Sequence, residues 1–483
     1  LEVDIIFVYT STITWYENAN TKYCKNEHPH GSSDDQMIPC MQMIIQASRV
    51  SLIYSTVFIP IHDFVSRRCW RFDLHPVHLG GSSVIVSLLC AILDHIRMGA
   101  GASATNVADA MERGASKEDV IKYFEEHPGG KRTSREWFFA AIDEDVTAHA
   151  MSFCKPGDAK CFPPGVACAM VTVSAGEDGK PVANALTGCG GIRQGNNEAN
   201  KCLNNDLWHL GSDGKAMTAM LCAILVDKGM ISWDFTVKDC EDVLTNETDS
   251  KYFPVTLKQL LSHTGGFDGG GGPAWDLAWE EHNANAHNPR EQRHVCLSSL
   301  LKSPPVAEPG TVHVYSNWGY TMAGHMLEHK LDKSFEDLLY IHLLGPLGIS
   351  KFGFGMPVGE NNPWGHGEQS GWEPKDPAHA GSDNPTAITP AGRMHMGLDD
   401  WARFAAVTLS AKLANEVLGL TEETYNDMYK PVASDYSTAG WIVVQRPWAK
   451  GNALTHTGSN TLNSCIGWLV PGGFSREDTP LGN

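Results

Sequence analysis

The sequence predicts an α/β fold of the α+β kind: an antiparallel sheet flanked by helices, closed by both chain ends and carrying an inserted, mostly helical lobe. Two observations predict it. Strand-like apolar runs lie towards both ends of the region that follows residue 163, at residues 166–173, 182–186, 439–444 and 464–470. Helical patterns fill the part between them, at residues 216–228, 319–331, 334–343 and 398–412. Strands at both ends with helices between them indicate one sheet with an inserted lobe.

The first two strands are expected to pair as a hairpin. The run at 166–173 follows the dipeptide Pro164-Gly165 and is almost wholly apolar, which is typical of a buried strand. Asp178-Gly179 is a hairpin turn signal, after which residues 182–186 return. Residues 135–152, which precede this hairpin, are rich in Ala, Phe and Glu and are expected to be helical.

Composition bounds the class of protein. The chain has 483 residues, of which 42% are hydrophobic and 19% charged, so most of it is expected to fold around a core. Its formal net charge of −19 argues against a nucleic-acid binder, because such proteins present a basic face to phosphates. No apolar run reaches the roughly 18 residues that a membrane-spanning helix needs, so no transmembrane segment is expected.

Three regions are expected: a doubtful stretch at 1–97, a helical or linker lead-in at 98–133, and the domain that carries the chemistry at 134–483. Met98 opens the pattern Met-Gly-x-x-x-Ser, which is typical of an N-myristoylated start. We hypothesise that Met98 is the initiator and that residues 1–97 are not native coding sequence; a divergent N-terminal region is the alternative. A start at Met98 favours the cytoplasm and allows an N-myristoyl contact with a membrane.

The cysteines leave the redox compartment open. The chain has 13 of them and shows no Cys/His spacing of a zinc site. Cys154 with Cys161, and Cys189 with Cys202, are two candidate loop disulfides. Free or buried thiols are the favoured alternative, because nothing in the sequence establishes an oxidising compartment.

The first candidate for catalysis is Ser212 with Lys215. Residues at i and i+3 on a helix share one face, so the lysine amine can reach the serine hydroxyl. A serine needs a neighbouring base to become a nucleophile, and a lysine whose pKa burial has lowered can be that base. The spacing alone is weak evidence, because Ser299 and Lys302 repeat it in this chain.

Two further motifs contain residues suited to the same chemistry. Tyr315 can hold or transfer a proton beside an ammonium, and the amide of Asn317 can orient Lys215 or a substrate carbonyl. Near the C-terminal strand, His456 opens a His-Thr-Gly triplet whose glycine permits close approach of a substrate. The same triplet also occurs earlier in the chain, at His263, to which we assign a packing or turn role.

Together these segments resemble the serine β-lactamase and penicillin-binding-protein superfamily, in its class C-related branch of esterases and D-amino peptidases. Ser-x-x-Lys is one of the catalytic motifs of that superfamily. The resemblance covers about residues 135–483 and is carried by residues 164–167, 210–215, 257–267, 315–317, 390–392, 399–404 and 456–458.

The resemblance implies a function for each motif. Ser212 would attack a carbonyl and form an acyl-enzyme, while Lys215 and Tyr315 would share the base and acid roles as one coupled pair. Asn317 would hold the substrate or Lys215. Substrate and oxyanion contacts would come from the backbone N–H groups of Ser212 and Ser459 and from the segment His456, Thr457, Gly458 and Ser459. No metal and no cofactor are implied.

Three departures from the family pattern affect the expected substrate and extent. His456 stands where the family usually has Lys, and a neutral imidazole attracts a carboxylate less than an ammonium does. We therefore favour neutral esters or amides, with carboxylesterase-like activity, over β-lactams and free-carboxylate peptides. The chain stops 12 residues after Pro471, where relatives usually continue into another strand and a long helix, so the domain is expected to be truncated. The loop at 188–205 is long and carries two cysteines.

The favoured hypothesis is a serine hydrolase that acts on an ester, amide or lactam carbonyl of a small-molecule or peptide substrate. The second is a catalytically inactive binding or scaffold protein that keeps the fold. A metal-dependent hydrolase is the third, since His28 with His30 and His75 with His78 have spacings typical of metal ligands. An α/β-hydrolase is disfavoured because no Gly-x-Ser-x-Gly elbow occurs.

Overall fold

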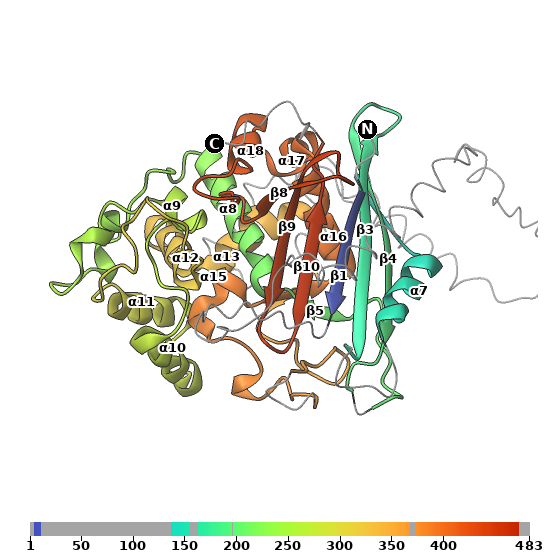
Figure 1. Ribbon diagram of the computed structural model, residues 1–483, viewed down its shortest axis with the longest axis horizontal. Helices are drawn as coiled ribbons and strands as arrows, with labels where there is room; N and C mark the ends of the chain where they lie inside the picture. The colour runs from blue at the N-terminus through green and yellow to red at the C-terminus, as the bar shows by residue number, and fades with distance from the viewer. Residues whose placement is uncertain (1–3, 11–136, 155–162, 196, 368–372, 473–483) are drawn as a thin grey trace, which may run out of the picture. The chain divides into compact units, whose positions relative to one another are not determined.

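The computed structural model describes residues 4–10, 137–154, 163–195, 197–367 and 373–472, which belong to one compact unit (Figure 1). In this part of the chain the main sheet has the strand order β2-β4-β3-β1-β10-β9-β8. Its neighbours pair antiparallel except for β2 and β4, which are parallel. The strands are β1 (Asp4–Thr10), β2 (Phe138–Ile142), β3 (Gly165–Ala175), β4 (Pro181–Gly191), β8 (Ile442–Arg446), β9 (Gly451–Ser459) and β10 (Ser464–Leu469).

The strand β1 was not predicted from the sequence. It lies between β3 and β10 and pairs antiparallel with both, so that Ile6 is opposite Met170 on one side and Trp468 on the other. Strands from the two ends of the described chain therefore meet in the middle of the sheet. Residues 11–136 lie outside the described residues, as do 473–483. The start at Met98, its myristoylation, the boundaries of the first two regions and the truncation therefore stay predictions.

Helices cover the sheet and form a lobe beside it (Figure 1). A small second sheet, in the order β5-β7-β6, leads into the nucleophile segment. Its strands are β5 (Leu207–His209), β6 (Phe352–Phe354) and β7 (Met394–Gly397). The helices are α7 (Glu144–Phe153), α8 (Gly214–Asp227), α9 (Leu257–Leu261), α10 (Gly272–Ala284), α11 (Pro289–Leu300), α12 (Asn317–Leu331), α13 (Phe335–Leu339), α14 (Gly345–Leu347), α15 (Thr389–Gly392), α16 (Leu398–Leu409), α17 (Ala411–Leu418) and α18 (Glu422–Met428).

The predicted fold class is confirmed, and its strands and helices lie within a few residues of their expected positions. The helical prediction for 135–152 is wrong in its first part, because residues 138–142 form β2 and pair with β4. The helix starts only after Asp143, whose carboxylate accepts the backbone N–H groups of Asp145 and Val146 and so caps α7. A cap of this kind ends the strand and begins the helix within one residue.

The helix α8 forms the centre of the core. Every residue from Gly214 to Leu225 is buried, which fits a helix that is apolar on nearly all sides. It packs against α15, α12 and α18, while α16 packs against β3 and β4 of the sheet. Because α8 starts two residues after Ser212, this burial also fixes the candidate nucleophile.

Further expectations from the sequence concern membrane-spanning helices, metal ligands and disulfides. Among the described residues no helix has the length and apolar character to cross a bilayer, and no three metal-binding side chains cluster. Cys154, Cys189 and Cys202 are free thiols, whereas Cys161 lies outside the described residues. The histidine spacings near the N-terminus also lie outside them.

A buried ion network joins the helices of the lobe. The Arg293 guanidinium on α11 pairs with Glu328 on α12, and its Nη1 donates to Glu336 on α13 at 2.9 Å. The side chains of Arg293 and Glu328 are fully buried. Burial alone would raise the pKa of Glu328, but Arg293 and His325 hold it down at about 2. The charge of Glu328 therefore stabilises the fold above its ordinary pKa of 4.5, and this contribution is lost as the pH falls towards 2.

Replacing Glu328 with Gln should lower the free energy of unfolding at neutral pH by about 3 kcal/mol, because the buried Arg293 charge loses one carboxylate and keeps that of Glu336. Urea unfolding measures this. The control Lys251→Ala removes an exposed ion pair with Glu308, which should cost less than about 1 kcal/mol. Equal losses in the two variants would contradict the role given to the network.

Candidate active site

Ser212 lies on a short turn, η1 (Gly211–Asp213), that leads directly into α8. Lys215 is in the first turn of that helix, and its Nζ is 3.0 Å from the Ser212 Oγ. The spacing of three residues thus brings hydroxyl and amine into hydrogen-bonding contact, as the sequence predicted.

The amine of Lys215 is buried and has two further partners. Its Nζ donates to the Asn317 Oδ1 at 2.8 Å and to the carbonyl oxygen of Ala391 at 2.6 Å. Burial lowers the pKa of this amine well below its ordinary value, and the nearby carboxylate of Asp213 opposes part of that effect. The site therefore favours the neutral amine, which is the form that can accept a proton.

Tyr315 and Asn317 enter the site from the start of α12. Asn317 is the first residue of that helix, whose N-cap is Ser316. The Tyr315 hydroxyl hydrogen-bonds with Ser212, and burial of the hydroxyl raises its pKa above the ordinary value of 10.0. The Lys215 Nζ lies 4.8 Å from the centre of the tyrosine ring. Tyr315 is 38% exposed, so solvent reaches this side of the site.

His263 holds the segment that carries Tyr315. Its carbonyl oxygen accepts the Val314 N–H at 2.8 Å, and its Nδ1 accepts the Ser316 N–H at 3.0 Å. The imidazole also lies against the Tyr315 ring, with 4.4 Å between the ring centres. The structure thus gives His263 the packing and turn role expected from the sequence.

The strand β9 divides the His-Thr-Gly-Ser segment between two faces. His456 and Gly458 are buried, whereas Thr457 and Ser459 are exposed, which follows the alternation of side chains along a strand. The His456 Nδ1 is 3.2 Å from the Asp213 Oδ1, and its Nε2 is 3.2 Å from the Tyr436 hydroxyl. Both ring nitrogens are therefore occupied inside the protein, and the imidazole faces away from Thr457 and Ser459.

Asp213 and Tyr436 were not among the predicted site residues. Asp213 is fully buried, and this burial raises the pKa of its carboxyl although the hydrogen bond from His456 opposes the rise. An acidic residue between Ser212 and Lys215, on a turn too tight for all three to face the same way, was the signal that sequence reasoning missed. Tyr436 gave no signal, since only the folding of residues 436–442 against β9 brings it to His456.

The nucleophile turn and the end of β9 lie in direct backbone contact. Gly211 has a φ of 53°, and a Cβ at this position would overlap the backbone at Gly458 and Ser459. A Cβ at Gly458 would in turn lie 2.8 Å from the Ser212 nitrogen. Only glycine fits at both positions, so the backbone N–H groups of Ser212 and Ser459 lie on two segments that abut.

Comparison with known proteins identifies the family of this chain. A family model described as Beta-lactamase matches residues 159–473. Penicillin-binding protein 4 of Amycolatopsis lactamdurans is 26% identical over 260 residues, which cover 52% of this chain and 63% of that protein. The Unguisins hydrolase ungD of Aspergillus violaceofuscus (strain CBS 115571) is 24% identical over 157 residues, which cover 30% of this chain and 25% of that protein. This chain thus spans less than two thirds of either relative.

Two solved structures are similar at lower identity. The octameric penicillin-binding protein homologue from Pyrococcus abyssi has a TM-score of 0.46 and 18% identity, over 65% of this chain and 71% of that one. A D-stereospecific amidohydrolase from Streptomyces sp. has a TM-score of 0.48 and 20% identity, over 68% of this chain and 94% of that one. Because the family model matches more than half of the 483 residues and includes Ser212, Lys215, Tyr315 and His456, this chain belongs to the beta-lactamase family.

Proposed function

We propose that this chain is a serine hydrolase that works through an acyl-enzyme, with Ser212 as the nucleophile and Lys215 and Tyr315 as its proton-handling pair. One observation carries the proposal. The buried Lys215 amine touches the Ser212 hydroxyl, the Asn317 amide oxygen and the Ala391 carbonyl oxygen at once.

The geometry suits a neutral amine acting as a base. Two N–H groups of such an amine donate to Asn317 and Ala391, which leaves its lone pair directed at the Ser212 hydroxyl. The hydroxyl proton then passes to Lys215 as the Ser212 oxygen attacks the substrate carbonyl. Tyr315, which hydrogen-bonds with the same hydroxyl, shares this proton with Lys215.

In the remaining steps, Lys215 and Tyr315 pass this proton to the leaving group and then assist hydrolysis of the acyl-enzyme. The new Oγ–C bond makes a tetrahedral oxyanion, for which the N–H groups of Ser212 and Ser459 are the proposed donors. The ester C–O bond then breaks, and the pair of Lys215 and Tyr315 returns the proton to the departing alkoxide. Water attacks the acyl-enzyme in a second round, giving up its proton to the same pair, which restores it to Ser212.

Neutral esters are the proposed substrates, with carboxylesterase-like activity. His456 takes the place of an ammonium in the strand beside the nucleophile, and both its nitrogens are engaged by Asp213 and Tyr436. Neither ring nitrogen is therefore directed at a substrate carboxylate from this position. Ligands whose binding depends on an ion pair at this position lose that interaction here.

The first test asks whether Ser212 is the nucleophile. A fluorophosphonate probe should label the wild-type chain, and Ser212→Ala should abolish labelling because the attacking oxygen is gone. Ser299→Ala is the matched control, since Ser299 has the same spacing to Lys302 but lies on α11, outside the site. Absence of labelling in a folded wild-type chain would instead favour the inactive binding or scaffold protein.

The second test concerns the pKa of Lys215. Asp213→Asn removes the negative charge that favours the ammonium, so the pKa of Lys215 should fall further. Since the neutral amine is the base, the acidic limb of the kcat/KM profile should move to lower pH. The amide oxygen can still accept the His456 hydrogen bond. A limb that stays in place or moves to higher pH would refute Lys215 as the base.

The third test compares substrates. A short-chain nitrophenyl ester should be hydrolysed with a higher kcat/KM than a chromogenic lactam or a D-Ala dipeptide, both of which carry a carboxylate. Steady-state rates at one pH are sufficient, with Ser212→Ala as the blank. A preference for either carboxylate-bearing substrate would contradict the role given to His456.

A further inference from the structure

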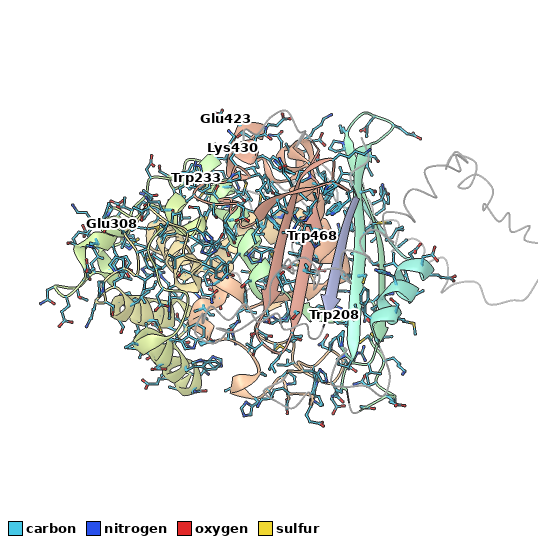
Figure 2. All side chains as sticks on the ribbon, viewed as in Figure 1. Trp208, Trp233, Glu308, Glu423, Lys430 and Trp468 are labelled. Carbon is cyan, nitrogen blue, oxygen red and sulfur yellow. The ribbon has the colours of Figure 1, made fainter. Side chains whose placement is uncertain are left out.

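A second group of buried polar residues lies beside the nucleophile turn and takes no part in the proposed proton transfer. It consists of His209 at the end of β5, Asp383 in the segment before α15, and Asn460 directly after β9. His209, Asp383 and Asn460 are 3%, 6% and 4% exposed, respectively. Figure 2 shows the position of β5 through its labelled Trp208, near one end of the main sheet.

His209 connects this group to the nucleophile turn. Its Nδ1 accepts the Gly211 N–H at 3.0 Å, so this nitrogen carries no proton. The proton is then on Nε2, which donates to the Asp383 carboxylate at 3.0 Å. The bond to Gly211 holds a glycine with a positive φ, one residue before Ser212.

Asn460 connects the same carboxylate to the end of β9. Its Nδ2 donates to the Asp383 Oδ1 at 3.1 Å, while its Oδ1 accepts the backbone N–H groups of Leu462 and Asn463. Asn460 follows Ser459 directly. The carboxylate also accepts the Asn384 N–H at 2.7 Å and lies 3.7 Å from Arg393, so its charge is compensated within the protein.

We infer that Asp383, His209 and Asn460 form a buried bridge that sets the separation of the two backbone segments proposed to bind the oxyanion. One carboxylate holds Gly211 through His209 on one side and holds the residue after Ser459 on the other. The three are positioning residues and touch no reacting atom. The inference rests on the proposed function, because it assigns these residues to the oxyanion site of that reaction.

The proposed reaction explains why the separation of these two backbone segments must be fixed. An oxyanion hole works only if both donors are fixed where the charge develops, and a displacement of about 1 Å can cost about 100-fold in rate. The two donors lie on segments more than 240 positions apart in the sequence, which meet without side chains at Gly211 and Gly458. A buried hydrogen-bonded bridge on the flank of this contact supplies the constraint that two glycines lack.

Two substitutions of His209 separate its two bonds. His209→Asn keeps an acceptor near Gly211 but loses the donor to Asp383, whereas His209→Gln can keep the donor but loses the acceptor. Each should lower kcat for a nitrophenyl ester about 10- to 100-fold with KM unchanged, because the loss falls on the transition state. The affinity for an aryl boronic acid, which forms a tetrahedral adduct at the serine, should fall in parallel.

Asn460→Asp tests the hydrogen bond from Asn460 to Asp383. It keeps the acceptor for Leu462 and Asn463 but removes the donor and places a second carboxylate against Asp383, so kcat should fall by a similar factor. The double variant Asp383→Asn/Asn460→Asp restores a donor–acceptor pair and should recover much of the lost kcat. Combining His209→Asn with Asn460→Asp should cost little more than the worse single variant, since both break one bridge.

Asp400→Asn is the matched control, because Asp400 is also a buried carboxylate that accepts two backbone N–H groups, from Ser350 and Lys351, outside this bridge. It should lower Tm but leave kcat and boronic acid affinity unchanged. Folded variants of the bridge with wild-type kcat, additive losses, or a loss confined to KM would overturn the inference while the labelling of Ser212 stands. A wild-type chain that neither labels nor hydrolyses esters would overturn the proposed function, and this inference with it.

Discussion

The site depends on a single buried amine. The Lys215 Nζ is the point where three elements distant in sequence meet: the nucleophile turn through Ser212, the start of α12 through Asn317, and the end of α15 through the Ala391 carbonyl. An amine without access to water is costly to charge, and each of its contacts must be satisfied by the protein. Its burial fixes the geometry of the site and also lowers the pKa that makes the lysine a base.

The surroundings of this amine follow from strand and turn geometry. Alternation along β9 directs Thr457 and Ser459 to the open side and His456 to the interior, where Asp213 holds it. The same turn that presents Ser212 therefore presents its neighbour Asp213 to the core. Paired glycines at 211 and 458 let the backbones of the turn and the strand meet, and the network around Asp383 lies on the flank of that contact.

Local geometry explains what could be predicted from the sequence. Ser212 and Lys215 are three residues apart, and the apolar character of α8 is visible in the sequence, so their contact needs only a helix. The closeness of Tyr315 and Asn317 to Lys215 could be expected through the family resemblance alone, since they are about 100 positions away. The backbone acceptor at Ala391 and the pair of His456 and Asp213 arise from tertiary packing, which leaves no periodic signal. The pairing of β1 with β3 and β10 is equally non-local.

The proposed reaction requires Lys215 to be a neutral amine under the conditions in which the chain acts. A ¹⁵N NMR titration of lysine side chains, with the Lys215 signal assigned by its loss in Lys215→Arg, measures this directly. We expect the pKa of the Lys215 amine to lie well below the ordinary lysine value of 10.5. An amine that stays protonated up to that value would contradict it, because no base would then be available to Ser212.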